Sequence, residues 1–242
     1  MKNILITGGM SGIGLATALE LHNSQTNVIV IGQNKEKNNR IQEKYPFLTV
    51  LSANLSNINE IEKVTQKIKN DFGKIDVFFA NAGYGIFKPF EQITESDFDA
   101  SVDLNYKGTF FTIQKILPLL NPGSSIIINT SWTYQRGLYA STLYSLTKSA
   151  ISYLVKSLAL ELAERKIRIN SISPGYTNTE QFNESNIESI QLGSMLRHVP
   201  MNRFGEASEI AKVVSFLASD SSSYVNGQEI IVDGGLTSVH VD

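Results

Sequence analysis

Three residues in the middle of the chain, Ser131, Tyr144 and Lys148, have side chains that could together move a proton. The periodicity of residues 144–163 predicts a helix, and a separation of four residues places Tyr144 and Lys148 on one face of it. A tyrosine ordinarily ionises at about pH 10, but a neighbouring ammonium favours the phenolate and lowers that pKa. The pair is therefore a candidate acid and base for a reaction near neutral pH.

Ser131 distinguishes this pair from a second tyrosine and lysine with the same spacing. Tyr84 and Lys88 are surrounded by glycines and a proline, which favour a loop, so we interpret that second pair as a coincidence. The apolar run at residues 125–129, in contrast, has the pattern of a buried strand that ends just before Ser131. Ligands of open parallel sheets bind at the carboxyl ends of the strands, where Ser131 would lie.

A glycine-rich turn follows the first predicted strand and opens a helix. Residues 7–14 read Thr-Gly-Gly-Met-Ser-Gly-Ile-Gly. Gly8 permits a tight turn, Gly12 lets the backbone approach a pyrophosphate, and Gly14 lets the helix pack closely on the sheet. An ordinary strand-to-helix turn is the alternative, but the position after a first strand favours a dinucleotide site, with amides and helix dipole facing the anion. The predicted contacts are Gly8, Ser11, Gly12, Ile13 and Gly14.

The end of the second predicted strand bears on the choice between NAD and NADP. Enzymes that prefer NAD usually place an acidic residue there, about 20 residues after the turn, to bind the ribose hydroxyls. In this chain the residues are Gln33, Asn34 and Lys35, none of which is acidic. A 2′-phosphate would meet no repulsion and could contact these side chains, so we predict a preference for NADP.

Composition and charge exclude several classes of protein. A chain of 242 residues with 42% hydrophobic content is long enough for one α/β domain with a substantial core. The formal net charge is −2, so we expect no binding surface for nucleic acid or for an anionic membrane. The local basic cluster of Lys35, Lys37, Arg40 and Lys44 is interpreted as the solvated face of a helix.

The chain has no cysteine, which excludes disulfides and thiolate chemistry and suits a reducing compartment. His22, His198 and His240 are scattered, which argues against a zinc-dependent alcohol dehydrogenase. The apolar stretch at residues 2–6 is too short for a signal peptide, and no apolar run approaches the roughly 20 residues of a membrane span. We therefore expect a cytoplasmic protein.

Strand-like and helix-like segments alternate along the chain. The expected strands are residues 3–6, 27–31, 48–52, 75–80, 125–129, 167–172 and 229–232. The expected helices are residues 13–22, 35–44, 58–72, 95–119, 144–163 and 207–218. This alternation is typical of βαβ units, so we predict an α/β fold: a single Rossmann-type, doubly wound domain over residues 1–242, with about seven parallel strands and helices on both faces.

Residues 175–203 interrupt this alternation before the last helix. A long connection at the ligand edge is usually a binding loop or a lid, so we interpret this insertion as a substrate loop. The side chains that could form an apolar or aromatic substrate pocket are Tyr134, Leu138, Tyr139, Tyr176, Phe182, Met195 and Leu196.

These features together resemble the short-chain dehydrogenase/reductase family over residues 2–235, nearly the whole chain. The sequence Asn81, Ala82 and Gly83 is similar to the family's Asn-Ala-Gly element, which supports the adenosine side of the cofactor site. Asn105 matches the family's active-site asparagine. The serine, tyrosine and lysine described above match its catalytic residues in order and spacing.

Two further motifs extend the resemblance toward the carboxyl end. Pro174 and Gly175, followed by Thr177 and Thr179, are similar to the segment that holds the nicotinamide carboxamide. Residues 233–235, Asp-Gly-Gly, resemble the closing motif of many reductases in the family.

The chain departs from the family pattern at two positions. Asn54 stands where an aspartate commonly contacts adenine, and since an amide can still donate and accept hydrogen bonds, we expect altered contacts at Asn54 and Leu55 but retained binding. Trp132 follows the serine where a small residue is frequent. Its ring could form a wall of the pocket or pack in the core.

The resemblance implies a mechanism for a carbonyl or secondary alcohol substrate. Tyr144 would donate a proton to the carbonyl oxygen while a reduced nicotinamide delivers hydride to carbon, and Ser131 would bind the same oxygen. Lys148 would lower the tyrosine pKa and bind the nicotinamide ribose, and Asn105 would hold a water that links the lysine to solvent. The reverse reaction oxidises the alcohol.

Other functions on the same fold remain to be distinguished. A dinucleotide-sensing regulator without catalysis is one alternative, although the complete set of catalytic residues argues against it. Epimerisation and dehalogenation are less favoured, because the chain lacks room for a large substrate domain and keeps its glycine turn. Family members usually form dimers or tetramers through the helices equivalent to residues 95–119 and 144–163, so a homodimer or homotetramer is expected.

Overall fold

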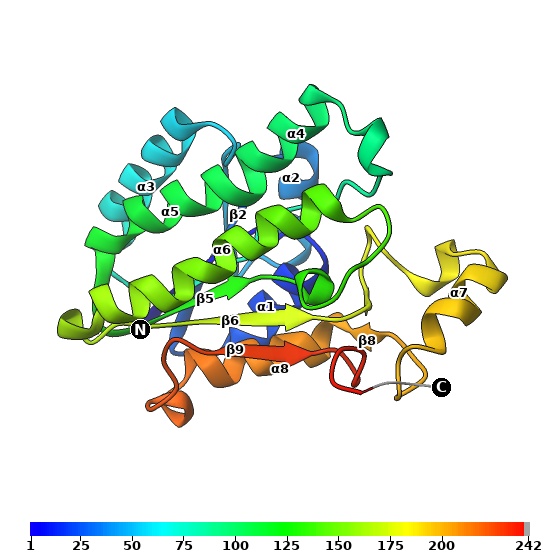
Figure 1. Ribbon diagram of the computed structural model, residues 1–242. Coiled ribbons are helices and arrows are strands. Elements are labelled where there is room, and N and C mark those ends of the chain that lie inside the picture. Colours follow the sequence, from blue (N-terminus) through cyan, green and yellow to red (C-terminus); the bar gives the residue numbers. More distant parts are fainter. Residues whose placement is uncertain (240–242) are drawn as a thin grey trace.

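The computed structural model describes residues 1–239, whose core is a parallel sheet of seven strands (Figure 1). The strand order is β3-β2-β1-β4-β5-β6-β9. All strands are parallel, but β2 and β3 are added on one side of β1 and the later strands on the other, so the order changes sense between β1 and β4. The predicted α/β, doubly wound fold is confirmed, while His240 and the end of the predicted domain lie outside the described residues. The strands are β1 (Lys2–Thr7), β2 (Thr26–Gly32), β3 (Thr49–Ser52), β4 (Ile75–Ala80), β5 (Leu120–Asn129), β6 (Arg168–Pro174) and β9 (Glu229–Val232).

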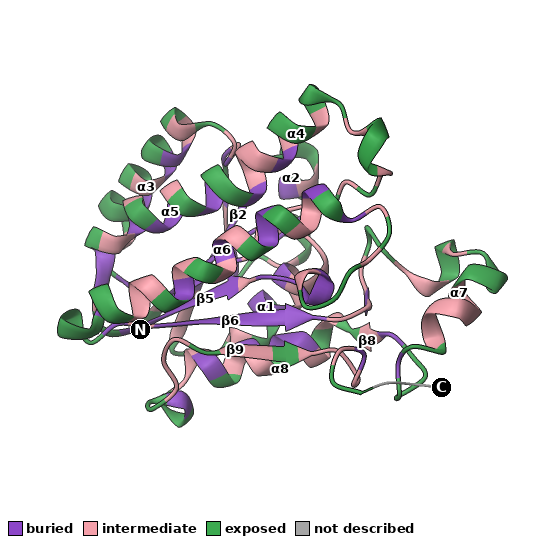
Figure 2. Cartoon of the chain, viewed as in Figure 1, coloured by how far each residue is buried: buried purple, intermediate pink, exposed green. Residues whose placement is uncertain are grey.

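Helices cover both faces of the sheet because successive strand residues point to opposite sides. In β1, Leu5 packs toward one layer of helices, whereas Ile4 and Ile6 pack toward the other. Figure 2 shows the result in the strands at the centre of the sheet, which are buried along most of their length. The first layer contains α3 (Ile58–Phe72), α5 (Thr109–Ile116) and α6 (Thr142–Glu161), and the second contains α1 (Gly12–Leu21), α2 (Lys35–Lys44) and α8 (Ala207–Ala218).

Helix α3 illustrates how local sequence specifies these layers. Its buried residues, Ile61, Val64 and Ile68, recur at intervals of three and four, which places them on one face toward the sheet. The side chain of Asn57 caps the helix start by accepting a hydrogen bond from the Asn59 amide. The helix therefore begins and packs where the sequence pattern predicts.

The helix expected over residues 95–119 is helical but not uniform. It consists of α4 (Glu95–Ser101), a π-helical segment (Val102–Gly108), α5 and a short 3-10 turn. A Cβ atom at Gly108 would lie 2.4 Å from the backbone oxygen of Leu55, so this part of the helix passes very close to the neighbouring loop. Such π segments are frequent at functional sites, and this one contains Asn105.

The insertion at residues 175–203 has its own secondary structure. It contains β7 (Thr177–Asn178), which pairs with β8 (Gly205–Glu206), and the helix α7 (Ser189–Leu196). Figure 1 shows α7 beyond the carboxyl ends of the strands. No residue of α7 is fully buried, and in Figure 2 this helix is pink and green, whereas the central strands β5 and β6 are mostly purple. The insertion thus stands over the ligand edge without joining the core.

Candidate active site

A cleft of about 990 Å³ opens at the carboxyl edge of the sheet, near the top of the usual size range for ligand sites. The predicted residues that line it are Gly8, Ser11, Gly12, Ile13, Gln33, Asn34, Leu55, Asn81, Ala82, Gly83, Ser131, Tyr144, Lys148, Pro174, Gly175, Thr177 and Thr179. The predicted residues outside the lining are Gly14, Lys35, Asn54 and Asn105. The topology therefore brings together side chains from the beginning, middle and end of the chain.

Helix α6 carries Tyr144 and Lys148 on the face that borders the cleft. The Nζ atom of Lys148 lies 5.7 Å from the centre of the Tyr144 ring. It donates a hydrogen bond of 2.7 Å to the backbone oxygen of Asn129, at the end of β5. The predicted placement of phenol and amine on one helix face is confirmed, and β5 fixes the position of the amine.

Burial dominates the electrostatics of this pair. It raises the pKa of the Tyr144 hydroxyl above 10.0, and a hydrogen bond with Ser131 opposes this shift only in part. It lowers the pKa of Lys148 from 10.5 to about 8. The sequence-based expectation that the ammonium lowers the tyrosine pKa is wrong for this structure, because the loss of hydration is the larger effect. The phenol is held protonated, which is the form that can donate a proton.

Ser131 lies at the end of β5, where the chain turns into a short 3-10 helix. Its Oγ atom accepts hydrogen bonds from the Thr133 backbone N–H (3.3 Å) and the Thr133 hydroxyl (3.1 Å). Because both of these bonds use Ser131 as acceptor, its own hydroxyl proton can be donated toward Tyr144 or a ligand oxygen. The serine is therefore a positioned donor beside the tyrosine.

Asn105 lies under the site and does not border the cleft. It is fully buried, and its side chain bonds both the N–H (3.0 Å) and the backbone oxygen (2.9 Å) of Tyr84. It also donates to the Thr147 hydroxyl on α6 at 3.2 Å. A Cβ atom at Gly83 would lie 2.9 Å from the Asn105 Oδ1 atom and 3.4 Å from the Lys148 Nζ atom. Asn105 thus joins the loop after β4 to the helix that carries the tyrosine and lysine.

The glycine turn is held by Asn81, whose side chain donates to the backbone oxygens of Thr7 (3.0 Å) and Gly8 (3.2 Å). Gly8 has a φ of 64°, a conformation that side chains rarely adopt. A Cβ atom at Gly14 would lie only 2.2 Å from the Gly8 backbone oxygen. Gly14 therefore serves the close packing of turn and helix, while Gly8 faces the cleft.

The end of the cleft beside β2 is where we expect the cofactor ribose. It contains a different lysine from the one that the sequence indicated. Gln33 and Asn34 line it, but Lys37 does so in place of Lys35. The Asn34 side chain caps α2 by accepting from the Lys37 backbone N–H at 2.9 Å, so Lys37 begins directly above the cap. A side chain three residues after a helix cap lies in the first turn of the helix. This position could have distinguished Lys37 from the lysines on the solvated face of the helix.

Asn54 is turned away from this end of the cleft. Its Oδ1 atom accepts from the Ser56 N–H at 3.0 Å, which closes a local turn. Ala53 and Leu55, its neighbours, line the cleft instead. The chain therefore contacts the cleft here through apolar side chains and backbone.

Five of the proposed substrate-pocket residues line the cleft: Leu138, Tyr139, Tyr176, Phe182 and Met195. Tyr134 and Leu196 do not. The Tyr134 hydroxyl instead donates to the Glu229 carboxylate and lies 3.0 Å from the Ser152 hydroxyl. Sequence reasoning missed Phe87, whose ring lies 5.2 Å from that of Tyr144 and whose loop gives no periodic signal.

Trp132 has both of the expected roles, as a wall of the pocket and as a residue packed in the core. It lines the cleft, and it packs in a small buried cluster with Val199 and Leu236. Its ring also meets that of Tyr176 at 5.2 Å. The tryptophan therefore connects the wall of the cleft to the base of the insertion.

Comparison with known proteins identifies the family. A family model described as enoyl-(acyl carrier protein) reductase matches residues 8–237. A 3-oxoacyl-[acyl-carrier-protein] reductase of Staphylococcus epidermidis is 34% identical over 97% of this chain and 98% of its own length. The chain belongs to the short-chain dehydrogenase/reductase family. It is an NAD(P)-dependent oxidoreductase.

Further relatives of this reductase have varied names. A glucose 1-dehydrogenase of Gluconobacter oxydans is 34% identical, covering 98% of this chain and 92% of the relative. The crystal structure of levodione reductase has a TM-score of 0.89 at 32% identity, covering 99% of this chain and 98% of the other. A short-chain dehydrogenase/reductase from Serratia marcescens has a TM-score of 0.92 at 23% identity and supports the fold alone.

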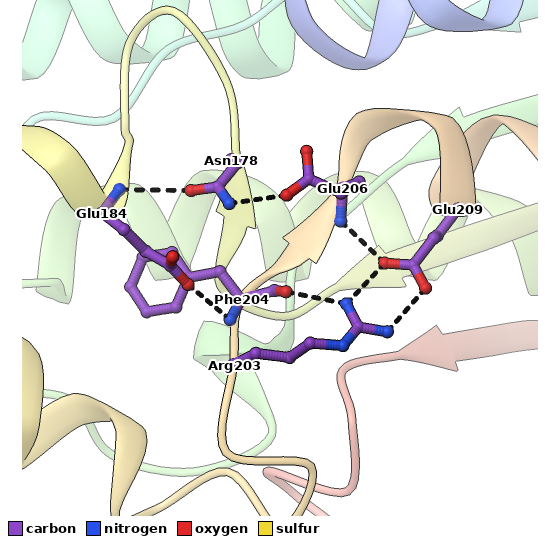
Figure 3. Close-up of polar contacts among 6 residues, drawn as sticks. All are labelled: Asn178, Glu184, Arg203, Phe204, Glu206 and Glu209. Carbon is purple, nitrogen blue, oxygen red and sulfur yellow. Dashed lines mark hydrogen bonds and ion pairs between the residues drawn. The ribbon is translucent and has the colours of Figure 1, made fainter.

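Side-chain bonds close the base of the reductase's insertion (Figure 3). Asn178 accepts from the Glu184 N–H at 3.1 Å and donates to the Glu206 carboxylate at 2.8 Å. Arg203 donates from both terminal nitrogens to Glu209 on α8, each at 2.7 Å. The two ends of the insertion are thereby joined to each other and to the start of α8.

An aromatic stack reinforces this base. The ring of Phe204 stacks with those of Tyr176 and Phe182, at 5.1 and 5.3 Å between ring centres, and the latter two rings are 6.0 Å from each other. The Phe204 backbone N–H also donates to the Glu184 carboxylate at 2.7 Å. The base is therefore well held, whereas α7 extends beyond it.

Within residues 1–239 no group of three or more His, Cys, Asp or Glu side chains is arranged to hold a metal ion. In the same part of the chain no helix combines the length and the apolar character that crossing a bilayer requires.

Proposed function

We propose that this enzyme reduces a carbonyl compound to a secondary alcohol with a reduced nicotinamide dinucleotide, and catalyses the reverse oxidation, with Tyr144 as the acid and base. The observation that carries the proposal is a partly buried, protonated phenol that shares one cleft with a serine donor and a buried amine. A bound reduced nicotinamide would supply the hydride.

The residues of the cleft fit such a cofactor. A Cβ atom at Gly8 would lie 3.0 Å from the Ala82 Cα atom, so only bare backbone fits at this point of the turn. Asn129, whose backbone oxygen binds Lys148, also lines the cleft, and its buried Oδ1 atom has no hydrogen-bond partner within the described residues. Such an atom favours a polar ligand with a donor group near the lysine.

The chain's own groups would perform the proton chemistry. The Tyr144 hydroxyl would donate its proton to the carbonyl oxygen as negative charge develops there, and the Ser131 hydroxyl would donate a hydrogen bond to the same oxygen. Lys148 would bind the ribose beside the nicotinamide and pass a proton back toward the phenol. Asn105 would support this relay by holding a water, as the family resemblance implies.

The cofactor is a nicotinamide dinucleotide, and we infer a preference for NADP. The end of β2 has no acidic side chain, and Lys37 contributes a cation to the same end of the cleft. The substrate is a small-molecule carbonyl compound or alcohol, from a small ketone to a fatty acyl chain, held against the apolar and aromatic wall that includes Phe87, Trp132 and Tyr176. The homo-oligomer and the cytoplasmic location stay predictions.

The test replaces Tyr144 by phenylalanine. We expect Tyr144→Phe to lower kcat by about 10²- to 10⁴-fold, the usual contribution of a general acid, because the substitution removes the proposed acid. Dissociation constants of the dinucleotides should change by less than about threefold, since the ring and the helix are retained. Turnover would be followed on ketones, diketones, sugars and acyl thioesters.

A matched control lies on the same helix. Tyr153 is 68% exposed and is not part of the cleft, so Tyr153→Phe should retain wild-type kcat. Wild-type turnover by Tyr144→Phe would refute the assignment of the acid. Cofactor binding without turnover of any compound would favour a dinucleotide sensor.

A further inference from the structure

An acidic side chain from the insertion reaches the ribose end of the cleft. Glu180 accepts a hydrogen bond from the Lys37 Nζ atom on α2, and the two form an ion pair. The Lys37 ammonium lowers the pKa of the Glu180 carboxyl, and the Ser11 hydroxyl, in the glycine turn, contributes to the same shift. Glu180, Lys37 and Ser11 all line the cleft.

The position of Glu180 is set by a tight turn. The Thr179 backbone N–H donates to the Phe182 oxygen at 2.8 Å, and the Phe182 N–H donates to the Thr179 hydroxyl at 3.2 Å. Phe182 is held in the aromatic stack, and Asn178 is held at the base shown in Figure 3. The base of the insertion thus presents Glu180 at the tip of the turn.

The same turn lies against the phosphate-binding segment. A Cβ atom at Gly12 would lie 3.2 Å from the side chain of Thr179, so the turn passes directly over that glycine. Glu180, one residue further, therefore lies where the cleft passes from the glycine turn to the end of β2. The carboxylate that β2 lacks is supplied here from a distant part of the chain.

Lys37 cannot pair fully with two anions at once. It is the cation placed to meet a 2′-phosphate, and the Glu180 carboxylate already neutralises it. Accepting the deduction that the enzyme binds a nicotinamide dinucleotide in this cleft, we propose that Glu180 sets cofactor selectivity by competing with the 2′-phosphate of NADP for Lys37. NAD lacks that phosphate and leaves the ion pair intact.

Isothermal titration calorimetry with NADP⁺ and with NAD⁺ tests this without turnover. Glu180→Gln should tighten NADP⁺ about tenfold and change NAD⁺ less than about twofold, because only the phosphate needs the lysine. Glu180 has a side chain that is 64% exposed, so the variant should fold normally. Glu36→Gln removes the same charge next to Lys37, at a side chain 87% exposed and outside the cleft, and should leave both affinities within about twofold.

The lysine completes a double-mutant cycle. Lys37→Gln should weaken NADP⁺ about tenfold, and adding Glu180→Gln to it should have no further effect, because the acid acts through the lysine. An unchanged ratio of the two affinities in Glu180→Gln, or an equal gain with and without Lys37, overturns the inference while both dinucleotides still bind. A wild-type protein that binds neither dinucleotide overturns the proposed function and this inference together.

Discussion

The two sides of the cleft are built in different ways. The proposed cofactor side consists of strand ends and a glycine turn, where backbone packs on backbone so closely that one added carbon at Gly14 would approach an oxygen to 2.2 Å. The proposed substrate side is the insertion, joined to the body by side-chain bonds at its base, with a helix of which no residue is fully buried. The first side should therefore tolerate almost no change in its residues, whereas the residues of the second side can vary with the substrate.

The largest expected effect comes from disrupting the close backbone packing on the proposed cofactor side. Gly14→Ala places a methyl group against the Gly8 oxygen, so the turn and α1 must separate. We expect a loss of about 3 kcal/mol in the free energy of unfolding and at least about a tenfold weaker dinucleotide. Urea unfolding and calorimetry measure the two effects.

The same substitution in α7 provides the contrast. A Cβ atom at Gly193 would have the Arg197 guanidinium, at 3.9 Å, as its nearest neighbour. Gly193→Ala should therefore stabilise the protein by up to about 1 kcal/mol through helix propensity and leave dinucleotide affinity unchanged. Equal destabilisation by both substitutions would contradict the difference between the two sides.

The burial of the Lys148 amine can be tested through the pH dependence of stability. Its pKa is lowered to about 8 in the folded protein by burial, whereas an unfolded lysine ionises at about 10.4. Between these values the unfolded chain binds more protons, so stability rises with pH across this window. Relative to Lys148→Met, the wild type should gain stability on the order of 3 kcal/mol from pH 8 to 10.5.

Urea midpoints of the two proteins, measured across that pH range, report the gain. Lys156→Met, at an exposed position on the same helix, is the control for removing a lysine. A constant difference between Lys148→Met and wild type would show that the amine is not buried as described.

The smallest effect concerns the base of the insertion. Arg203→Met removes the paired hydrogen bonds to Glu209 and loosens the segment that carries α7. We expect KM for the carbonyl substrate to rise about threefold while the dinucleotide dissociation constants stay within about twofold. Arg197→Met, which removes the same charge at the end of α7, serves as the control. Equal effects on cofactor and substrate would indicate that the base supports both sides.

Short-range pattern was enough to predict much of this molecule. The alternation of strands and helices, the glycine turn and the pair formed by Tyr144 and Lys148 all follow from periods of two and 3.6 residues and from local backbone requirements. The boundaries shifted by a few residues, as for α6, which begins at Thr142. The π segment around Asn105 gave no signal, because it depends on the contact of Gly108 with a loop far away in the chain.

The sequence by itself determined the seven strands of the main sheet, the main helices between them and the residue types that follow the strand ends. Only the tertiary structure decided that Tyr134 faces away from the cleft, that burial raises the tyrosine pKa, and that Glu180 reaches Lys37. The physical reason is that strands and turns depend on neighbours along the chain, whereas hydration and charge pairing depend on whatever folding brings near.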